Sequence, residues 1–298
     1  MPRIGVDLGG TKIEGIVLEA DGRIGLRERL ATPAGDYPAT LAAVAGLVER
    51  LEARCGCRCS VGIGTPGSLS PATGRLRNAN STCLNDRPLD VDLAARLGRP
   101  VRIANDADGF ALSEASDGAA CGVSSVFGVI IGTGTGGGIV IDGKLLQGPN
   151  AISGEWGHNP LPWSNDQERP GPLCYCGKQG CIETFLSGPG LSRDYASDPR
   201  LPARTIAQRA AAGEPAADAC LERYEDRLAR SLAGVINTID PEAIVLGGGL
   251  SNIARLYETV PCLWGRYVCS DVVRTRLLSP AHGDSSGARG AAWLWPAT

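Results

Sequence analysis

Three cysteines and a histidine near the middle of the chain have the spacing of a metal site. Cys174, Cys176 and Cys181 lie in the segment C-Y-C-G-K-Q-G-C, and His158 ends the segment E-W-G-H. Thiolates and imidazole hold Zn²⁺ in a closed tetrahedron, so these four side chains suffice for a structural site. The only other histidine, His282, is far away in the sequence. We therefore predict that these four residues bind zinc.

Two carboxylates bracket this motif. Glu155 lies shortly before His158, and Glu183 follows Cys181 closely. Acidic side chains that are fixed beside a rigid metal site favour a polar ligand bound there. The alternative is a purely structural knuckle with incidental acids, and spacing alone leaves both interpretations open.

A second group of cysteines, Cys55, Cys57 and Cys59, lies in the segment C-G-C-R-C. It has no histidine nearby and falls between a helical stretch and a strand, so we interpret it as loop cysteines. The chain has 11 cysteines, an odd number, and nothing in the sequence suggests export. We therefore expect reduced thiols in a cytoplasmic protein.

The elements around these motifs contain an internal repeat. Residues 5–17 read G-V-D-L-G-G-T-K-I-E-G-I-V, and residues 128–140 read G-V-I-I-G-T-G-T-G-G-G-I-V. Each copy predicts a β-hairpin with a glycine turn. Two similar hairpins that begin two similar halves indicate a duplicated fold with a cleft between the copies.

The glycine turns are candidates for binding phosphate. Glycine permits positive φ and lets backbone N–H groups approach an anion. Polar side chains surround these turns: Asp7, Thr11 and Lys12 lie at the first, and Thr133 lies at the second. A third segment, A-I-V-L-G-G-G-L-S-N at 243–252, predicts a buried strand, a turn and a helix start. None matches the Walker pattern. Each alone could be a structural turn, but the three together favour nucleotide binding.

Further elements are expected between the hairpins. Apolar residues at helical spacing predict a helix over 37–53, and the residue types predict strands over 61–67 and 101–104. Asn105 and Asp106 follow the last strand and precede another predicted helix. A carboxylate at such a strand end faces the place where ligands bind in α/β folds. The alternative is that Asp106 is only the N-cap of the helix.

Composition restricts the class of protein. The chain of 298 residues is long enough for two domains, and 43% hydrophobic with 20% charged residues is typical of a globular protein. The net charge of −3 gives no reason to expect nucleic acid or an anionic membrane as partner. The N-terminus lacks the pattern of a secretory signal, and no apolar run approaches the ~20 residues of a membrane span.

Together these motifs resemble the ROK family, which comprises repressors, uncharacterised reading frames and sugar kinases within the actin/hexokinase-like ATPase superfamily. The combination of G-E-W-G-H with C-x-C-G-x-x-G-C-x-E carries the resemblance, which spans nearly the whole chain. It implies a duplicated actin/hexokinase-like (ribonuclease H-like) α/β fold, with two domains around a cleft and a zinc-binding insertion. The implied domains are residues 1–108 with a C-terminal helix at 285–298, and residues 109–284 with the zinc motif at 155–183.

The resemblance also implies a role for each matching residue. Asp106 matches the catalytic base, and His158 matches both a zinc ligand and a sugar contact. The residues that match sugar contacts are Gly67, Asn80, Asn105, Asp106, Glu155, His158 and Glu183. The residues that match the binding site for ATP and Mg²⁺ are Asp7, Gly9, Gly10, Thr11, Lys12, Gly132, Thr133, Gly134, Gly136, Gly137, Gly247, Gly248 and Gly249.

Within the family, N-A-N-S-T-C-L-N and G-H-N-P-L-P-W look most like bacterial fructokinases, also described as manno(fructo)kinases. This implies that a homodimer transfers phosphate from ATP to the 6-hydroxyl of D-fructose, and also of mannose. The alternatives are a ROK glucokinase, an N-acetylhexosamine or N-acetylmannosamine kinase, and a non-catalytic sugar-sensing regulator. A repressor would carry a helix-turn-helix before the first hairpin, which begins at Ile4.

Two residues depart from the family pattern. Asp108 replaces the second Asn of N-D-A-N, and residues two apart on a helix point to different faces, so we do not expect it to compete with Asp106. Cys83 stands where an aromatic residue is common, which leaves the shape of the sugar pocket open.

Overall fold

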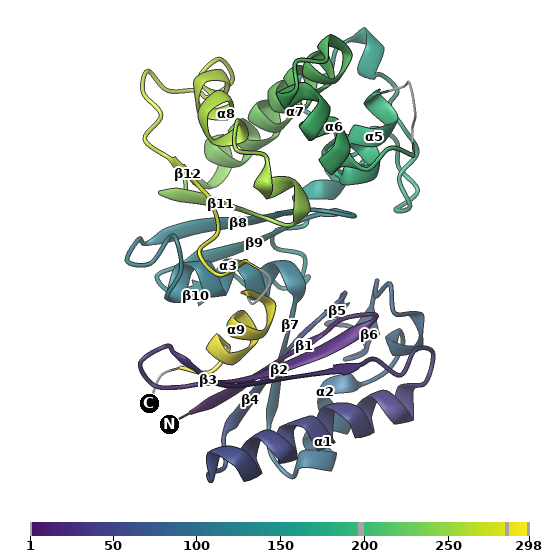
Figure 1. The fold of residues 1–298 in the computed structure, drawn as a ribbon, viewed down its shortest axis with the longest axis vertical. Helices are drawn as coiled ribbons and strands as arrows, with labels where there is room; N and C mark the ends of the chain where they lie inside the picture. The colour runs from purple at the N-terminus through teal and green to yellow at the C-terminus, as the bar shows by residue number, and fades with distance from the viewer. Residues whose placement is uncertain (1, 196–199, 284–285, 297–298) are drawn as a thin grey trace. The chain divides into compact units, whose positions relative to one another are not determined.

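The computed structural model describes residues 2–195, 200–283 and 286–296, which form two compact units (Figure 1). The first unit comprises Met1–Cys121, Gly143–Ser153 and His282–Thr298, and the second comprises Gly122–Asp142 and Gly154–Ala281. Each unit is an α/β structure built around one main sheet. In the described residues, no helix combines the length and the apolar character that crossing a bilayer requires.

The sheet of the first unit has the strand order β3-β2-β1-β4-β7. Its strands are β1 (Arg3–Leu8), β2 (Lys12–Leu18), β3 (Ile24–Ala31), β4 (Ser60–Thr65) and β7 (Val101–Asn105). The first three form antiparallel hairpins, whereas β4 and β7 run parallel to β1. Two short strands, β5 (Ser68–Leu69) and β6 (Leu76–Arg77), pair with each other.

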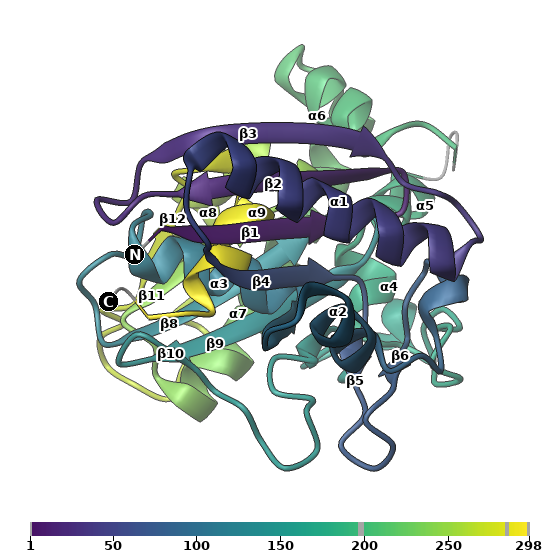
Figure 2. The same ribbon diagram turned by 90° about the horizontal axis from the view of Figure 1, so that it is seen from below.

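Helices cover both faces of this sheet. Ile4 and Val6 of β1 join the core beneath α1 (Tyr37–Cys55) and α2 (Leu89–Leu97), and Figure 2 shows α1 lying along the strands. Gly5 between them faces the opposite side, because successive strand residues alternate. A Cβ at Gly5 would lie 1.9 Å from the carbonyl oxygen of Ala288 in α9 (Ser286–Trp293), so only glycine lets α9 pack this closely.

The helices confirm several predictions and alter one boundary. The helix expected over 37–53 is α1, which begins after Asp36, whose side chain accepts the N–H of Ala39 at 2.9 Å. The predicted C-terminal helix is α9; residues 285, 297 and 298 lie outside the described part of the chain. The first unit keeps the whole of α3 (Asp106–Ser116), which packs on α9, whereas the sequence placed a boundary at residue 108.

The second unit repeats the arrangement of the first. Its strands have the order β9-β8-β11-β12, with β8 and β9 forming an antiparallel hairpin and β11 parallel to β8. These strands are β8 (Ser125–Ile131), β9 (Thr135–Ile141), β11 (Ala243–Gly247) and β12 (Arg276–Leu278), whereas the short β10 (Lys144–Leu145) belongs to residues 143–153, which group with the first unit. The two hairpins occupy equivalent places in the two sheets, which confirms the duplicated fold predicted from the repeat.

The core of the second unit lies between this sheet and a group of helices. These are α4 (Ile182–Leu186), α5 (Gly188–Tyr195), α6 (Ala203–Ala211), α7 (Pro215–Ile239) and α8 (Leu256–Trp264). The long α7 packs on the other four and buries Tyr224 and Leu228 in a core that also holds Phe127 and Val129 of β8. The helix start predicted after β11 is wrong: Gly249–Asn252 form one 3₁₀ turn, and α8 begins only at Leu256.

Candidate functional site

The four predicted zinc ligands lie together in the second unit. Cys174 Sγ is 3.5 Å from His158 Nδ1, Cys176 Sγ is 3.6 Å from Cys181 Sγ, and all four ligand atoms lie within 4.8 Å of one another. Zinc bonds of about 2.0–2.3 Å in a tetrahedron place the ligand atoms about 3.5–3.8 Å apart. The donor set and its spacing therefore fit a zinc ion.

The cysteine loop has the backbone that such a site requires. Gly177 and Gly180 both have positive φ, at 85° and 71°, which lets this short loop turn tightly around a central point. The pKa of Cys181 is raised to about 12. Burial is the main cause, and hydrogen bonds to Cys176 and Cys174 raise the pKa further. A bound cation would stabilise the thiolate that this environment otherwise disfavours.

The segment that carries His158 is fixed on β9. The Trp156 indole Nε1 donates to the carbonyl oxygen of Gly136 at 2.9 Å, and residues Trp156–His158 form a 3₁₀ turn. A Cβ at Gly157 would lie only 2.1 Å from the carbonyl oxygen of Thr135, so this position has room for glycine alone. The sheet thus fixes the backbone that presents the His158 ring.

Tyr175 contacts the side of the His158 ring that faces away from the cysteines. Its hydroxyl lies 2.9 Å from His158 Nε2, and the two rings meet edge to face with centroids 5.0 Å apart. A sugar hydroxyl that bonds to Nε2 would therefore share or replace this contact. The sequence did not identify Tyr175, because a residue between two metal ligands has no distinguishing pattern.

The two glutamates of the motif differ in their surroundings. Glu183 Oε2 accepts the backbone N–H of Thr135 at 2.9 Å, so this carboxylate joins the zinc-binding segment to the start of β9. Glu155 immediately precedes the 3₁₀ turn and is exposed. Glu183 is thus positioned by a hydrogen bond to the sheet of this unit.

Two of the predicted nucleotide turns meet in the second unit. Gly248, at φ 82°, lies so close to the end of β8 that a Cβ would be 2.5 Å from the carbonyl oxygen of Ile131. Gly132 follows Ile131, and its carbonyl oxygen accepts a hydrogen bond from the N–H of Gly188 at 2.7 Å. Thr133 is exposed at the turn. The structure therefore brings residues 132–134 beside 247–249.

Gly136 and Gly137 lie elsewhere than predicted. Both belong to β9 and pair with β8, and a Cβ at Gly137 would lie 2.7 Å from the ring of Phe127. Packing against this ring explains the glycine, and we assign neither residue a contact with phosphate.

The glycines of the two hairpin turns do not adopt the positive φ that we expected for backbone that approaches an anion. Gly9, Gly10, Gly132 and Gly134 all lie outside the positive-φ region. Lack of space favours glycine at two of these positions: a Cβ at Gly9 would be 2.9 Å from the carbonyl oxygen of Lys12, and one at Gly134 would be 2.8 Å from Glu183 Oε2, whereas a Cβ at Gly132 would meet no atom within 4 Å.

In the first unit, Asp7 and Asp106 lie at one edge of the sheet. The strands β1, β4 and β7 run parallel, so their carboxyl ends meet there. Burial raises the pKa of Asp7 to about 6, and the negative charges of Asp106 and Glu14 contribute further, while Lys12 opposes them. Glu14 is itself paired with Arg27, at 3.0 Å, and with Arg29. Carboxylate oxygens are the ligands that Mg²⁺ prefers, so Asp7 and Asp106 have suitable chemistry for this cation.

The pKa of Asp106 is also raised, chiefly because the surrounding protein partly desolvates its carboxylate. The residue as a whole is still exposed to solvent. Its carboxylate accepts the N–H of Ala107 at 2.9 Å, which opposes this effect. The alternative that Asp106 is the N-cap is wrong: Asn105 caps α3, accepting the N–H of Asp108 at 2.6 Å. Asn105 and Asp108 line a separate cavity of about 290 Å³ beside β5.

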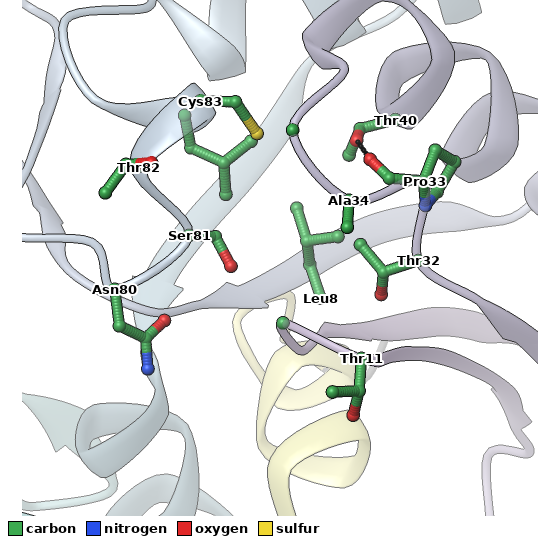
Figure 3. Close-up of a pocket in the computed structure, with 13 residues that line it drawn as sticks. Leu8, Thr11, Thr32, Pro33, Ala34, Thr40, Asn80, Ser81, Thr82 and Cys83 are labelled. Carbon is green, nitrogen blue, oxygen red and sulfur yellow. Dashed lines mark hydrogen bonds between the residues drawn. The ribbon is translucent and has the colours of Figure 1, made fainter.

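A cavity of about 330 Å³ lies beside the first glycine turn (Figure 3). Gly10 and Thr11 line one side, and Figure 3 shows the Ser81 hydroxyl and the Cys83 sulfur directed toward it. The other lining residues are Leu8, Thr32, Pro33, Ala34, Gly35, Thr40, Asn80, Thr82 and Leu84. The structure thus brings the predicted phosphate turn together with Asn80, a predicted sugar contact.

The sequence missed Thr32 and Ser81 at this cavity. Thr32 Oγ1 donates to the carbonyl oxygen of Gly9 at 2.7 Å, and a Cβ at Gly10 would lie 3.3 Å from Ser81 Oγ. Gly67, another predicted sugar contact, has φ 78°, and a Cβ there would lie 2.2 Å from the carbonyl oxygen of Arg77, so the local backbone explains this glycine.

Comparison with known proteins gives matches over nearly the whole chain. Residues 3–298 match the ROK family. The N-acetyl-D-glucosamine kinase of Photobacterium profundum is 40% identical over 297 residues, covering 97% of this chain and 98% of that protein. The ROK hexokinase of Thermus thermophilus has a similar structure, with a TM-score of 0.87, 32% identity and coverage of 98% of this chain and 97% of that one. A ROK glucokinase from Streptomyces griseus, in complex with glucose and AMPPNP, gives a TM-score of 0.78 at 28% identity and covers 99% of both chains.

Proposed function

We propose that this chain, which belongs to the ROK family, is a sugar kinase that transfers phosphate from ATP to the 6-hydroxyl of N-acetyl-D-glucosamine. The full-length similarity to N-acetyl-D-glucosamine kinases carries the choice of sugar. It favours the N-acetylhexosamine alternative over the fructose specificity that the sequence motifs implied. A hexose and an adenine nucleotide bound to the similar glucokinase support the two substrate classes.

Asp106 is the proposed catalytic base. The attacking 6-hydroxyl loses its proton to the Asp106 carboxylate while its oxygen bonds to the γ-phosphorus and ADP leaves. A general base is most effective when its pKa is close to the working pH. The raised pKa of Asp106 therefore suits it for this role better than an ordinary carboxylate would be.

The phosphates are assigned to the glycine turns. Residues 9–11 of the first unit, and residues 132–134 and 247–249 of the second, present backbone that can approach an anion closely. Asp7 would hold Mg²⁺, which would supply charge neutralisation for the transferred phosphoryl group. Lys12 is exposed at the start of β2 and can add a positive charge near the first turn.

The sugar is assigned to Asn80 and Asn105 in the first unit and to Glu155, His158 and Glu183 in the second. His158, Cys174, Cys176 and Cys181 would hold zinc, and four protein ligands would leave it no open position for chemistry. The bound ion would serve to fix the orientation of the His158 ring.

The acetamido group is assigned to the cavity beside the first turn. Leu8 and Ala34 give this cavity an apolar wall for a methyl group, and Asn80 and Ser81 offer polar partners for an amide. Cys83, which replaces a common aromatic residue, leaves this space open. Cys83→Phe should therefore lower kcat/KM for N-acetylglucosamine about 10-fold or more relative to glucose, because it fills the cavity. An unchanged ratio would assign the acetamido group elsewhere.

A coupled ADP-release assay over five sugars tests the proposed activity. The sugars are N-acetylglucosamine, N-acetylmannosamine, glucose, mannose and fructose, each with Mg²⁺ and ATP. We expect the highest kcat/KM for N-acetylglucosamine. A preference for fructose would restore the interpretation drawn from the sequence motifs. No ADP release with any sugar, from a folded protein that still binds sugar, would indicate a regulator without catalysis.

A further inference from the structure

A group of three thiols lies in the first unit, apart from the zinc ligands of the second. The Sγ atom of Cys55 is 3.6 Å from that of Cys57 and 3.8 Å from that of Cys59, and the last two are 4.0 Å apart. The three sulfur atoms thus form a nearly equilateral triangle. All three cysteines are free thiols.

The size of this triangle matches three thiolates on one metal ion. With metal–sulfur bonds of about 2.3 Å, tetrahedral geometry places sulfur atoms about 3.8 Å apart. Trigonal planar geometry with the same bond length places them about 4.0 Å apart. A disulfide would need two sulfur atoms at about 2.0 Å and would leave the third cysteine unpaired.

The backbone around the thiols is fixed by contacts outside the group. Gly56, at φ 73°, ends α1 and turns the chain between the first two cysteines. The N–H of Cys59 donates to Glu52 Oε1 at 2.6 Å, and Arg99 holds both oxygens of the same carboxylate at 2.6 and 2.8 Å. Because its oxygens are engaged in this way, Glu52 positions the loop and is not a further ligand.

A second contact holds the loop from its other side. Arg58, between two of the cysteines, donates to the carbonyl oxygen of Gly98 at 2.9 Å, where α2 ends. The loop is therefore attached both to α1 and to the end of α2. A site prepared in this way loses little conformational freedom when it binds an ion.

Burial differs across the triangle and leaves one side open. Cys59 is buried, Cys55 is half-buried and Cys57 is exposed. An ion bound to all three would thus be reachable from solvent, which can supply a fourth ligand such as water or a small thiol. This distinguishes the group from the closed zinc site of the second unit.

We propose that Cys55, Cys57 and Cys59 form a second metal site, which binds a thiophilic d¹⁰ ion of the Zn²⁺ type through three thiolates. On binding, three S–H bonds break, three metal–sulfur bonds form and three protons pass to solvent. The interpretation of these residues as incidental loop cysteines is thereby replaced. Soft thiolate sets select zinc and copper(I) over magnesium or calcium, so the site would not take Mg²⁺ from the kinase reaction.

Titration of the reduced, metal-free full chain with Cd²⁺ tests this proposal, because cadmium thiolates absorb in the ultraviolet. Wild type should bind two equivalents. Cys57→Ser should bind one and keep the kinase activity of wild type, since this exposed residue is outside the proposed catalytic machinery. Cys55→Ser provides a second variant with the same expected loss. Cys176→Ser should lose the other equivalent, and Cys262→Ser, at an exposed cysteine outside both groups, should still bind two.

The outcomes separate the two metal sites. One equivalent in wild type that persists in Cys57→Ser and disappears in Cys176→Ser would overturn the proposal. Two equivalents in both wild type and Cys57→Ser would do so as well. A disulfide within residues 55–59 of freshly purified protein, found by mass spectrometry of unreduced peptides, would assign the group to redox chemistry instead.

Discussion

The carboxylate of Glu183 accepts the backbone N–H of Thr135 at 2.9 Å and so joins the zinc-binding segment to the turn between β8 and β9. Thr135 is buried, and a Cβ at Gly134 would lie 2.8 Å from the same carboxylate oxygen. One side chain thus fixes the backbone of a turn assigned to phosphate while lying two residues from a zinc ligand. The residues proposed to contact the sugar and the nucleotide are therefore linked within this unit.

Two substitutions at Glu183 separate its possible roles. Glu183→Ala leaves the buried N–H of Thr135 without a partner, which costs about 1–3 kcal/mol. We expect KM for ATP to rise about 10-fold as the turn loosens, together with KM for the sugar. Glu183→Gln keeps an acceptor for the N–H but removes the charge, so only KM for the sugar should rise. Steady-state kinetics of both variants tests this, and equal KM values for ATP in the two variants would contradict the link.

Asp106→Asn should reduce kcat by about 10²–10⁴-fold, the usual effect of losing a positioned general base. The asparagine can still accept the N–H of Ala107 through its side-chain oxygen, so the start of α3 should be preserved. Asp108→Asn is the matched control, because residues two apart on a helix point to different faces, and it should keep turnover within a few-fold of wild type. Circular dichroism should show both variants folded. Wild-type kcat in Asp106→Asn would refute the assignment of the base.

The pKa of Asp7, about 6, predicts the acid limb of the pH profile. Below this pH the carboxylate is protonated and loses its affinity for Mg²⁺, so kcat/KM for ATP should fall about 10-fold per pH unit. Because the cation competes with the proton, raising the Mg²⁺ concentration should move this limb to lower pH. A profile that stays flat down to pH 5, or one that ignores Mg²⁺, would argue against Asp7 as the metal contact.

Local motifs predicted much of the fold and of the candidate site. The repeat at residues 5–17 and 128–140 predicted both hairpins, because strand alternation and a glycine turn are written in adjacent residues. The clustering of His158, Cys174, Cys176 and Cys181 was predictable for a similar reason: the three cysteines belong to one short loop, and the other histidine, His282, is far away in the sequence.

Contacts between distant segments were not predictable. Thr32 and Ser81 reach the cavity from the ends of other elements, and Tyr175 meets His158 through loop geometry that no spacing encodes. The reason for Gly9 and Gly134 was also misjudged, since it lies in crowding by the Lys12 carbonyl oxygen and by Glu183 and not in the sign of φ. The triangle of sulfur atoms at residues 55–59 likewise depends on how Glu52 and Arg58 hold the loop.

Asp7→Asn should make the protein more stable while it impairs catalysis. In the folded protein the pKa of Asp7 is raised from 3.8 to about 6, so the folded state holds this proton more tightly than the unfolded chain. Stability is therefore lost as pH rises from about 4 to 6, and the full cost is present above pH 6. Asparagine carries no charge and escapes this cost.

At pH 8 the Asp7→Asn substitution should therefore raise the free energy of unfolding by about 1–3 kcal/mol, given about 1.4 kcal/mol per pKa unit, and the gain should shrink as the pH is lowered toward 4. Urea denaturation at both ends of this range tests the prediction, with the exposed Asp271→Asn as a control that should stay within about 0.5 kcal/mol of wild type. A less stable Asp7→Asn at pH 8 would mean that the Asp7 carboxylate is stabilised in the folded protein, against the electrostatics of its surroundings.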